Sequence, residues 1–309
     1  CLVGSEMCIR DSSIMSQKKK DFYQYYATMM EPWDGPASIL FSDGDIMGAV
    51  LDRNGLRPSR YYITTDDYLI LSSEVGVLEI EPERIKVKER LRPGKMLLVD
   101  TVKGEVIDDN ELKDSYANMQ PYGEWLDRNL VELKDLKIPN ERVIEHRGED
   151  LSRLQKAFGY TYESTKDTIL PMARNGAESI AAMGIDSPIP VLSKDQQPLF
   201  NYFKQLFAQV TNPPIDCIRE EVVTSTTTYI GKDGNLLEEN AINCQVLKIH
   251  NPILTNTDLM KIRSMKREGF KVVTLPITYY KNTSLQKALD HLFVEADRAP
   301  VSYTHLRAH

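Results

Sequence analysis

The sequence predicts a mixed α/β protein of about two domains, an α+β part followed by an α/β part. Its 309 residues are enough to build two hydrophobic cores. Short apolar runs separated by turn residues fill positions 37–107, which is typical of an antiparallel sheet. After Leu151, helical patterns alternate with short apolar runs, which favours an α/β domain with parallel strands.

The amino-terminal part is expected to begin with a helix over 13–30. The strands that follow are expected to form a meander that makes up most of one antiparallel sheet. The dipeptide Asn54-Gly55 marks the bend of its second hairpin, because this pair tolerates the positive φ of a tight turn. The expected strands run over 37–41, 46–51, 61–64, 68–73, 96–100 and 105–107.

The middle of the chain turns helical over 110–136, with an interruption at Pro121, and is strongly charged over 134–149. We expect this charged stretch to be a solvated linker and the boundary between the two domains. Beyond it, a helix is expected over 198–209, because four large apolar residues there share one helix face.

Two short apolar runs in the last third of the chain, 246–249 and 272–275, predict buried strands. A capping-box pattern follows each run, Thr255-x-x-Asp258 after the first and Thr283-x-x-Gln286 after the second. Because a capping box satisfies backbone N–H groups at a helix start, we expect one helix to begin at each pattern. The second helix has an apolar stripe of Leu285, Leu289, Leu292, Phe293 and Ala296.

Composition excludes several classes of protein. The net charge is −7 and the basic residues are scattered, so nucleic acid is not an expected partner. No apolar run approaches the roughly 20 residues that span a bilayer, so we expect no membrane association. The four cysteines form no Cys-x-x-Cys pair, which gives no sign of a metal site and favours reduced thiols in the cytoplasm. They are Cys1, Cys8, Cys217 and Cys244.

A loop over 51–58 joins two apolar strands and carries Asp52, Asn54, Gly55, Arg57 and Pro58. On its residues alone it is a turn in which Asp52 and Arg57 hydrogen-bond across the bend. The string also resembles the D-x-x-G-x-R-P loop of class II glutamine amidotransferases. That resemblance implies an N-terminal-nucleophile hydrolase sandwich and makes these residues a structural loop of its amidotransferase domain.

Two further strings, SSEVG at 72–76 and RLRPGKMLLVD at 90–100, resemble the same domain. They leave amidophosphoribosyltransferases and asparagine synthetases open. The second half of the chain favours glutamate synthase, since it resembles the central domain of that family over a long stretch. The strings that carry this resemblance are FGYTYE at 158–163, PMARNGAESIAAMGIDSPIPVLS at 171–193 and YFKQLFAQVTNPPIDCIREEVV at 202–223.

The family resemblance implies a mechanism. An amino-terminal cysteine attacks the glutamine amide, and the released ammonia crosses a tunnel to 2-oxoglutarate. Reduced FMN then delivers hydride, with electrons that come through an iron–sulfur cluster from a small subunit or ferredoxin. Cys1 departs from the family pattern, because Leu2-Val3 follows it and only about fifty residues separate it from the 51–58 loop. We therefore expect no catalytic, cofactor-binding or metal-binding residue in this chain, and no activity of the chain alone.

A proline-locked turn at Thr211, Asn212, Pro213, Pro214 and Ile215 is the remaining candidate. On its residues alone it ends the 198–209 helix, since two prolines block helix continuation. The resemblance makes it a candidate wall of the ammonia tunnel. A competing hypothesis is a non-catalytic scaffold or channel protein with the same pair of domains.

The expected domain organisation follows from these strings. Both ends resemble translated sequencing adapter, so the native chain is expected to continue beyond them. The expected segments are an adapter-like stretch at 1–12, the carboxy-terminal part of the amidotransferase domain at 13–145, part of the central domain at 146–300 and a second adapter-like stretch at 301–309.

Overall fold

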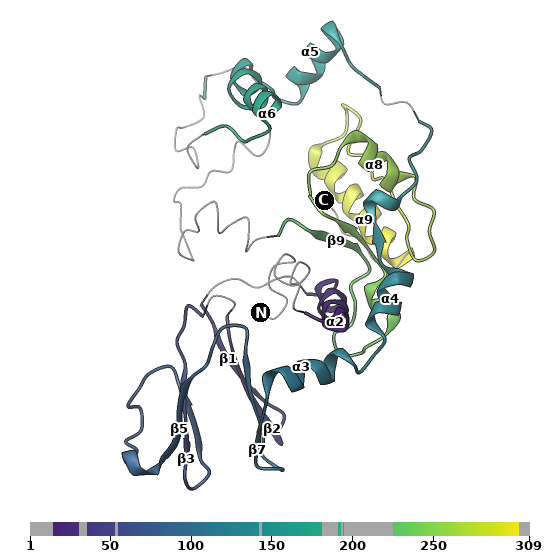
Figure 1. The fold of residues 1–309 in the computed structure, drawn as a ribbon. Coiled ribbons are helices and arrows are strands. Elements are labelled where there is room, and N and C mark those ends of the chain that lie inside the picture. Colours follow the sequence, from purple (N-terminus) through teal and green to yellow (C-terminus); the bar gives the residue numbers. More distant parts are fainter. Residues whose placement is uncertain are drawn as a thin grey trace. The chain divides into compact units, whose positions relative to one another are not determined.

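The computed structural model describes residues 15–30, 36–52, 55–141, 144–180, 191–192, 194 and 225–302, with backbone alone for 300–302. These residues divide into two compact units. One unit lies within Cys1–Glu141 and Ile215–His309, so it joins both halves of the chain, and the other lies within Arg142–Pro214. Figure 1 shows the elements of both units, and each unit is described by itself below.

The helices are α2 (Gln17–Ala27), α3 (Asp109–Ala117), α4 (Tyr122–Asn129), α5 (Gly148–Ala157), α6 (Leu170–Asn175), α8 (Asn256–Arg263) and α9 (Leu285–Ser302), with short helical segments η1 (Pro82–Arg84), η2 (Leu133–Asp135), η3 (Ser164–Ile169) and η5 (Ala241–Cys244). The strands are β1 (Ser38–Ser42), β2 (Ile46–Leu51), β3 (Arg60–Thr64), β4 (Leu69–Ser72), β5 (Ile85–Arg90), β6 (Met96–Asp100), β7 (Glu105–Ile107), β8 (Val131–Glu132), β9 (Thr228–Gly231) and β10 (Val246–Ile249).

Side-chain caps fix where several helices begin. The Ser16 hydroxyl accepts from Lys19 N at the start of α2, which confirms the expected first helix. At α8 the predicted capping box is present, with both Thr255 and Asp258 bonded as expected. At α9 the predicted box at Thr283 is wrong. The hydroxyl of Ser284 accepts from Lys287 N instead, so the helix begins one residue later than the pattern indicated.

The first sheet has the order β1-β2-β6-β7 and is antiparallel throughout. The hairpins β1–β2 and β6–β7 confirm two expected pairings. The expected second hairpin at Asn54-Gly55 is wrong, because β2 pairs with β6 and not with β3. The loop after Leu51 thus carries the chain from one sheet to another.

A second antiparallel sheet has the order β4-β3-β5, so the expected single sheet is two sheets. Strand β5 was not among the expected strands, although its sequence IKVKER alternates apolar with charged residues, as a strand with one covered face does. Figure 1 shows the two sheets face to face. Between them lies a core of Ala49, Leu51, Leu91 and Leu97, with Tyr61, Leu69 and Leu71 packed against it.

The third sheet, β8-β10-β9, is mixed. Strand β10 confirms the strand expected over 246–249, and it is parallel to β8 but antiparallel to β9. Parallel pairing is therefore only half of this sheet. The strand expected over 272–275 is wrong, because the chain there is irregular and Val273 is exposed. No described strand lies beside it to accept its backbone hydrogen bonds.

The second unit contains α5, the π-helical segment η3 and α6. No described residue of 144–180 is fully buried. The helix expected over 198–209 lies outside the described residues. Within the part of the chain that the structure describes, no helix is long and apolar enough to cross a membrane.

Candidate functional site

The buried carboxylate of Asp52 organises the loop that carries the amidotransferase-like motif. Its Oδ1 accepts from Ala37 N at 3.2 Å, and its Oδ2 accepts from Leu56 N at 3.1 Å. The predicted contact with Arg57 is made by the backbone N–H of that residue, at 3.5 Å. Asp52 is only 3% exposed. It therefore ties the end of β2 both to the residue before β1 and to its own loop.

Glycine is required at position 55 of this loop. The residue has φ +61°, and a Cβ there would lie 2.4 Å from Cγ of Pro93. Pro93 belongs to the amidotransferase-like string at 90–100, so that string lies against the 51–58 loop. A backbone bond from Leu91 N to Ser59 O, 2.8 Å long, supports the same contact.

Of the other predicted residues of this loop, some are exposed to solvent and one lies outside the described residues. Arg57 and Pro58 are exposed, so they lie at the surface of the loop. Asn54 is outside the described residues. So is the whole predicted tunnel turn of Thr211, Asn212, Pro213, Pro214 and Ile215.

A cluster of aromatic side chains forms a site that sequence reasoning missed. Tyr25 of α2 and Tyr122 of α4 are almost fully buried, at 0% and 2% exposure, with ring centroids 5.1 Å apart. Buried Cys244 of η5 completes the core, and burial raises the pKa of its thiol to about 11. The signal in the sequence was the aromatic run at 22–26, which serves α2 as its packing face.

The carboxylate of Glu239 accepts hydrogen bonds from two phenols of this cluster. Tyr26 and Tyr122 both donate to its Oε1, the latter at 3.1 Å. Burial and the hydrogen bond to Glu239 raise the pKa of the Tyr26 phenol far above its usual range. Burial and the Glu239 charge do the same to the pKa of Tyr122. Both phenols thus stay protonated donors over the whole neutral range.

Tyr25 makes a second polar contact with the same segment. Its hydroxyl donates to Asn240 O at 2.8 Å and lies 3.2 Å from Asn240 N. The buried Asn243 amide donates to the same hydroxyl at 3.3 Å and to Glu238 O at 2.6 Å. The aromatic core is therefore bordered by satisfied polar groups, as buried polar groups require.

A buried lysine extends the contact beside these tyrosines. Lys248 of β10 is 2% exposed, and its ammonium donates to Gln24 Oε1 at 3.0 Å. The Gln24 amide in turn donates to the Tyr229 hydroxyl at 2.7 Å. On β8, Glu132 Oε2 lies 3.0 Å from His250 Nε2. Burial raises the pKa of Glu132, but the hydrogen bonds with His250 and Lys134 lower it by more, so its pKa lies below the usual range.

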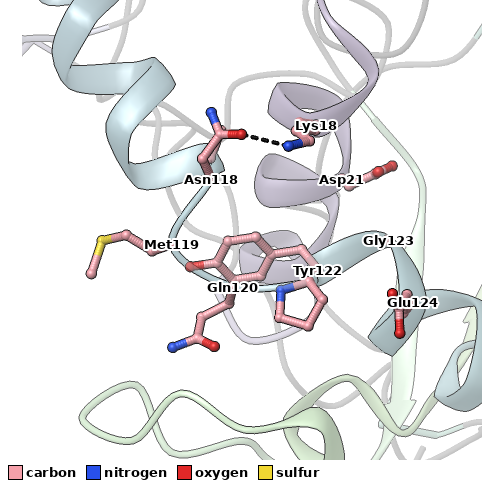
Figure 2. A pocket seen from close by; sticks show the side chains of 10 residues that line it. Lys18, Asp21, Asn118, Met119, Gln120, Tyr122, Gly123 and Glu124 are labelled. Carbon is pink, nitrogen blue, oxygen red and sulfur yellow. Dashed lines mark hydrogen bonds between the residues drawn. The ribbon is translucent and has the colours of Figure 1, made fainter.

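A pocket of about 450 Å³ lies beside this cluster, where α2 meets the turn between α3 and α4 (Figure 2). Figure 2 shows the Lys18 ammonium donating to Asn118 Oδ1, a bond of 2.6 Å. The Asp21 carboxylate faces the start of α4, since a Cβ on Gly123 would lie 2.6 Å from Asp21 Oδ2. The Asp21 carboxylate accepts from the Gln17 amide at 2.7 Å, a residue of the same helix.

The described residues do not fit the ligand set of an iron–sulfur cluster, which is built from several cysteine thiolates. Cys244 is the one cysteine among them, and it is buried. No group of three or more His, Cys, Asp or Glu side chains in the described ranges is placed to hold a metal ion. No step of chemistry is therefore assigned to a metal on these residues.

Two family models match the chain. The model of class-II glutamine amidotransferases matches residues 7–125, and the model of the glutamate synthase central domain matches residues 153–305. The two facing antiparallel sheets lie within the first match. The fold expectation, an incomplete N-terminal-nucleophile hydrolase sandwich followed by an α/β central domain, is confirmed.

Individual relatives agree with these matches. The chain is 45% identical to the Bacillus subtilis glutamate synthase [NADPH] large chain, over 94% of this chain and 19% of that protein. It is 43% identical to the Schizosaccharomyces pombe glutamate synthase [NADH], over 92% of this chain and 14% of that protein. It is also 43% identical to ferredoxin-dependent glutamate synthase 2 of Synechocystis sp., over 88% of this chain and 17% of that protein.

The chain thus contains parts of a class-II glutamine amidotransferase domain and of a glutamate synthase central domain. It belongs to the glutamate synthase family, as its motifs predicted. It spans less than a fifth of the length of these three relatives.

Proposed function

We propose that this chain is part of a glutamate synthase, which transfers the amide nitrogen of glutamine to 2-oxoglutarate and reduces the product to give two glutamates. The observation that carries the proposal is the order of two matches on one chain, an amidotransferase at 7–125 and a glutamate synthase central domain at 153–305. An amidotransferase match alone would fit other enzymes that use glutamine nitrogen. The second match favours this one.

Within that enzyme the chain supplies part of the glutaminase scaffold and part of the connector along which ammonia passes. The nucleophilic cysteine, the FMN site and the iron–sulfur ligands would belong to other parts of the protein. Electrons would come from a small subunit or ferredoxin, since relatives are named for NADPH, NADH and ferredoxin. We also propose that the enzyme is cytoplasmic. The proposed boundaries of the amidotransferase and central-domain segments are residues 12, 145 and 300.

The scaffold role is assigned to the loop that holds Asp52, Asn54, Gly55, Arg57 and Pro58. The backbone bonds accepted by Asp52 and the packing of Gly55 on Pro93 support a structural role, because they fix the crossing between two sheets. None of these contacts leaves the Asp52 carboxylate open to a substrate.

The tunnel role is assigned to the turn at 211–215. It rests on the resemblance and on the two prolines, since a proline ring restricts the backbone and removes an N–H donor. Ammonia is small and polar, so a rigid turn with the Thr211 hydroxyl and the Asn212 amide could guide it by hydrogen bonding.

The test uses the longer protein that contains this chain, purified with its cofactors. We expect it to form glutamate from glutamine and 2-oxoglutarate and to release little free ammonia. Thr211→Phe should narrow the passage, so that glutamine is still hydrolysed but less glutamate forms per glutamine consumed. Thr211→Ser is the matched control, since serine keeps the hydroxyl and does not enlarge the side chain.

Two outcomes would count against these assignments. A wild-type protein that neither hydrolyses glutamine nor forms glutamate would refute the enzyme assignment in favour of a scaffold or channel protein. Unchanged stoichiometry in Thr211→Phe would leave the enzyme assignment intact and would reduce the turn to a helix terminator.

A further inference from the structure

The contacts of helix α2 join two parts of the chain that the family models match separately. Three consecutive residues of α2, within the amidotransferase match, each bond to the central-domain match. Gln24 bonds to Tyr229 and Lys248, Tyr25 to the Asn240 backbone, and Tyr26 to Glu239. Sequence separations of 205 to 224 residues show that these are not local contacts.

Helix α4 reinforces the same contact from the amidotransferase side. Its Tyr122 donates to the Glu239 oxygen that also accepts from Tyr26. Its Leu126 shares a buried cluster with Tyr25 and Cys244. The two family matches therefore share one core within the first compact unit. We call the six residues Tyr25, Tyr26, Tyr122, Glu239, Asn240 and Asn243 the tyrosine joint.

Glu239 is the one member of the tyrosine joint that bonds to both amidotransferase helices. Its half-buried carboxylate gathers two phenol donors on a single oxygen. Hydrogen bonds to an ionised acceptor are stronger than neutral ones. Displacing the 238–244 segment from α2 or α4 would break at least one of these bonds and open the aromatic core.

We propose that Glu239 is a positioning residue that locks helices α2 and α4 to the 238–244 segment and so holds the two family parts in the alignment that ammonia transfer requires. This rests on the proposed function, because only an enzyme that passes ammonia from one part to the next needs that alignment. Glu239 touches no reacting atom. Its effect on transfer acts through the phenols of Tyr26 and Tyr122.

The first experiment uses the 309-residue chain and hydrogen–deuterium exchange. Glu239→Ala should raise exchange roughly tenfold in peptides from α2, α4 and 238–244, because both phenol bonds are lost. Glu239→Gln should stay near wild type, since an amide oxygen still accepts. Tyr61→Phe is the matched control, because it removes a phenol–carboxylate bond of 3.2 Å to Glu89, away from the joint. Unchanged exchange in Glu239→Ala would overturn the positioning role.

The second experiment uses the longer protein and follows free ammonia and glutamate together. Glu239→Ala should keep glutamine hydrolysis but release several times more free ammonia per glutamine than wild type. Glu239→Gln should restore the wild-type ratio, and Tyr61→Phe should not change it. If Glu239→Ala does not fold, Tyr26→Phe with Tyr122→Phe removes the same two bonds and keeps the packed rings.

The outcomes separate this inference from the proposed function. An unchanged ammonia-to-glutamate ratio in a folded Glu239→Ala protein would overturn the transfer role. A wild-type protein that forms no glutamate would refute the proposed function and the transfer role with it. The exchange experiment would then still decide whether Glu239 positions the two parts.

Discussion

Replacing Asp52 by alanine tests the reasoning about the loop between the two facing sheets. The change removes the carboxylate that accepts from Ala37 N at 3.2 Å and from Leu56 N at 3.1 Å, at a site only 3% exposed. Water cannot replace a buried acceptor, and a bond to a charged group contributes about 1.5 kcal/mol or more. The two bonds together predict a loss of about 3 kcal/mol in the free energy of unfolding.

The matched control is Asp43→Ala in the β1–β2 turn. The Asp43 carboxylate also accepts two backbone N–H groups, from Asp45 at 3.1 Å and Ile46 at 2.7 Å, but it is exposed. Water can take over both donors there, so we expect a loss of about 1 kcal/mol or less. The main difference is burial, because each carboxylate accepts two backbone N–H groups at 3.2 Å or less, and Asp52 accepts one longer bond besides, from Arg57 N at 3.5 Å.

Equilibrium urea unfolding, followed by far-ultraviolet circular dichroism, measures both variants. Hydrogen exchange of peptides from 36–60 then locates the effect. Exchange should rise in β1 and in the loop after β2 for Asp52→Ala only. If Asp52→Ala loses no more stability than Asp43→Ala, the Asp52 carboxylate does not hold the crossing between the sheets, and the scaffold argument for this loop fails.

Two further predictions concern glycine and pH. Gly55→Ala should cost about 2 to 3 kcal/mol, because φ is +61° and the new Cβ would lie 2.4 Å from Pro93, whereas Gly76→Ala, with φ +85° and open space, should cost about 1 kcal/mol. Burial, then the charge of Asp109, raises the pKa of Tyr23 to about 12, so the stability that this phenol contributes is complete below pH 10 and is lost as pH rises towards 12. Urea titrations measure the free energy of unfolding in both cases. Equal losses in the two glycine variants would contradict the first prediction. The second would be contradicted if wild type and Tyr23→Phe lost the same stability between pH 10 and pH 12.

Several features that depend on neighbouring residues were predicted correctly, although the capping box at Thr283 and the hairpin at Asn54-Gly55 were not. The β1–β2 and β6–β7 hairpins and the capping box of α8 each join residues only a few positions apart. The helix break at Pro121 is of the same kind, because proline lacks a backbone donor. Local propensity was enough to predict these elements, because their contacts lie within a few residues.

Pairings between distant strands were not predicted. The apolar run of β2 fits either neighbour, and only packing between the two sheets makes β6 its partner and sends β3 to the other sheet. The run at 272–275 has strand-like residues, yet it is irregular where no described strand lies alongside. Strand propensity is realised only when a partner satisfies the backbone.

The amino-acid sequence by itself determined the family of this protein, the two kinds of domain in it and the order in which they follow. Long specific strings and local turn chemistry carry that information. Only the tertiary structure showed that Tyr26 and Tyr122 meet Glu239 and that Tyr25 meets Asn240, because these bonds join residues more than a hundred positions apart. No periodicity in either segment marks that contact. It exists because the chain buries the aromatic face of α2, and a buried phenol needs a hydrogen-bond acceptor.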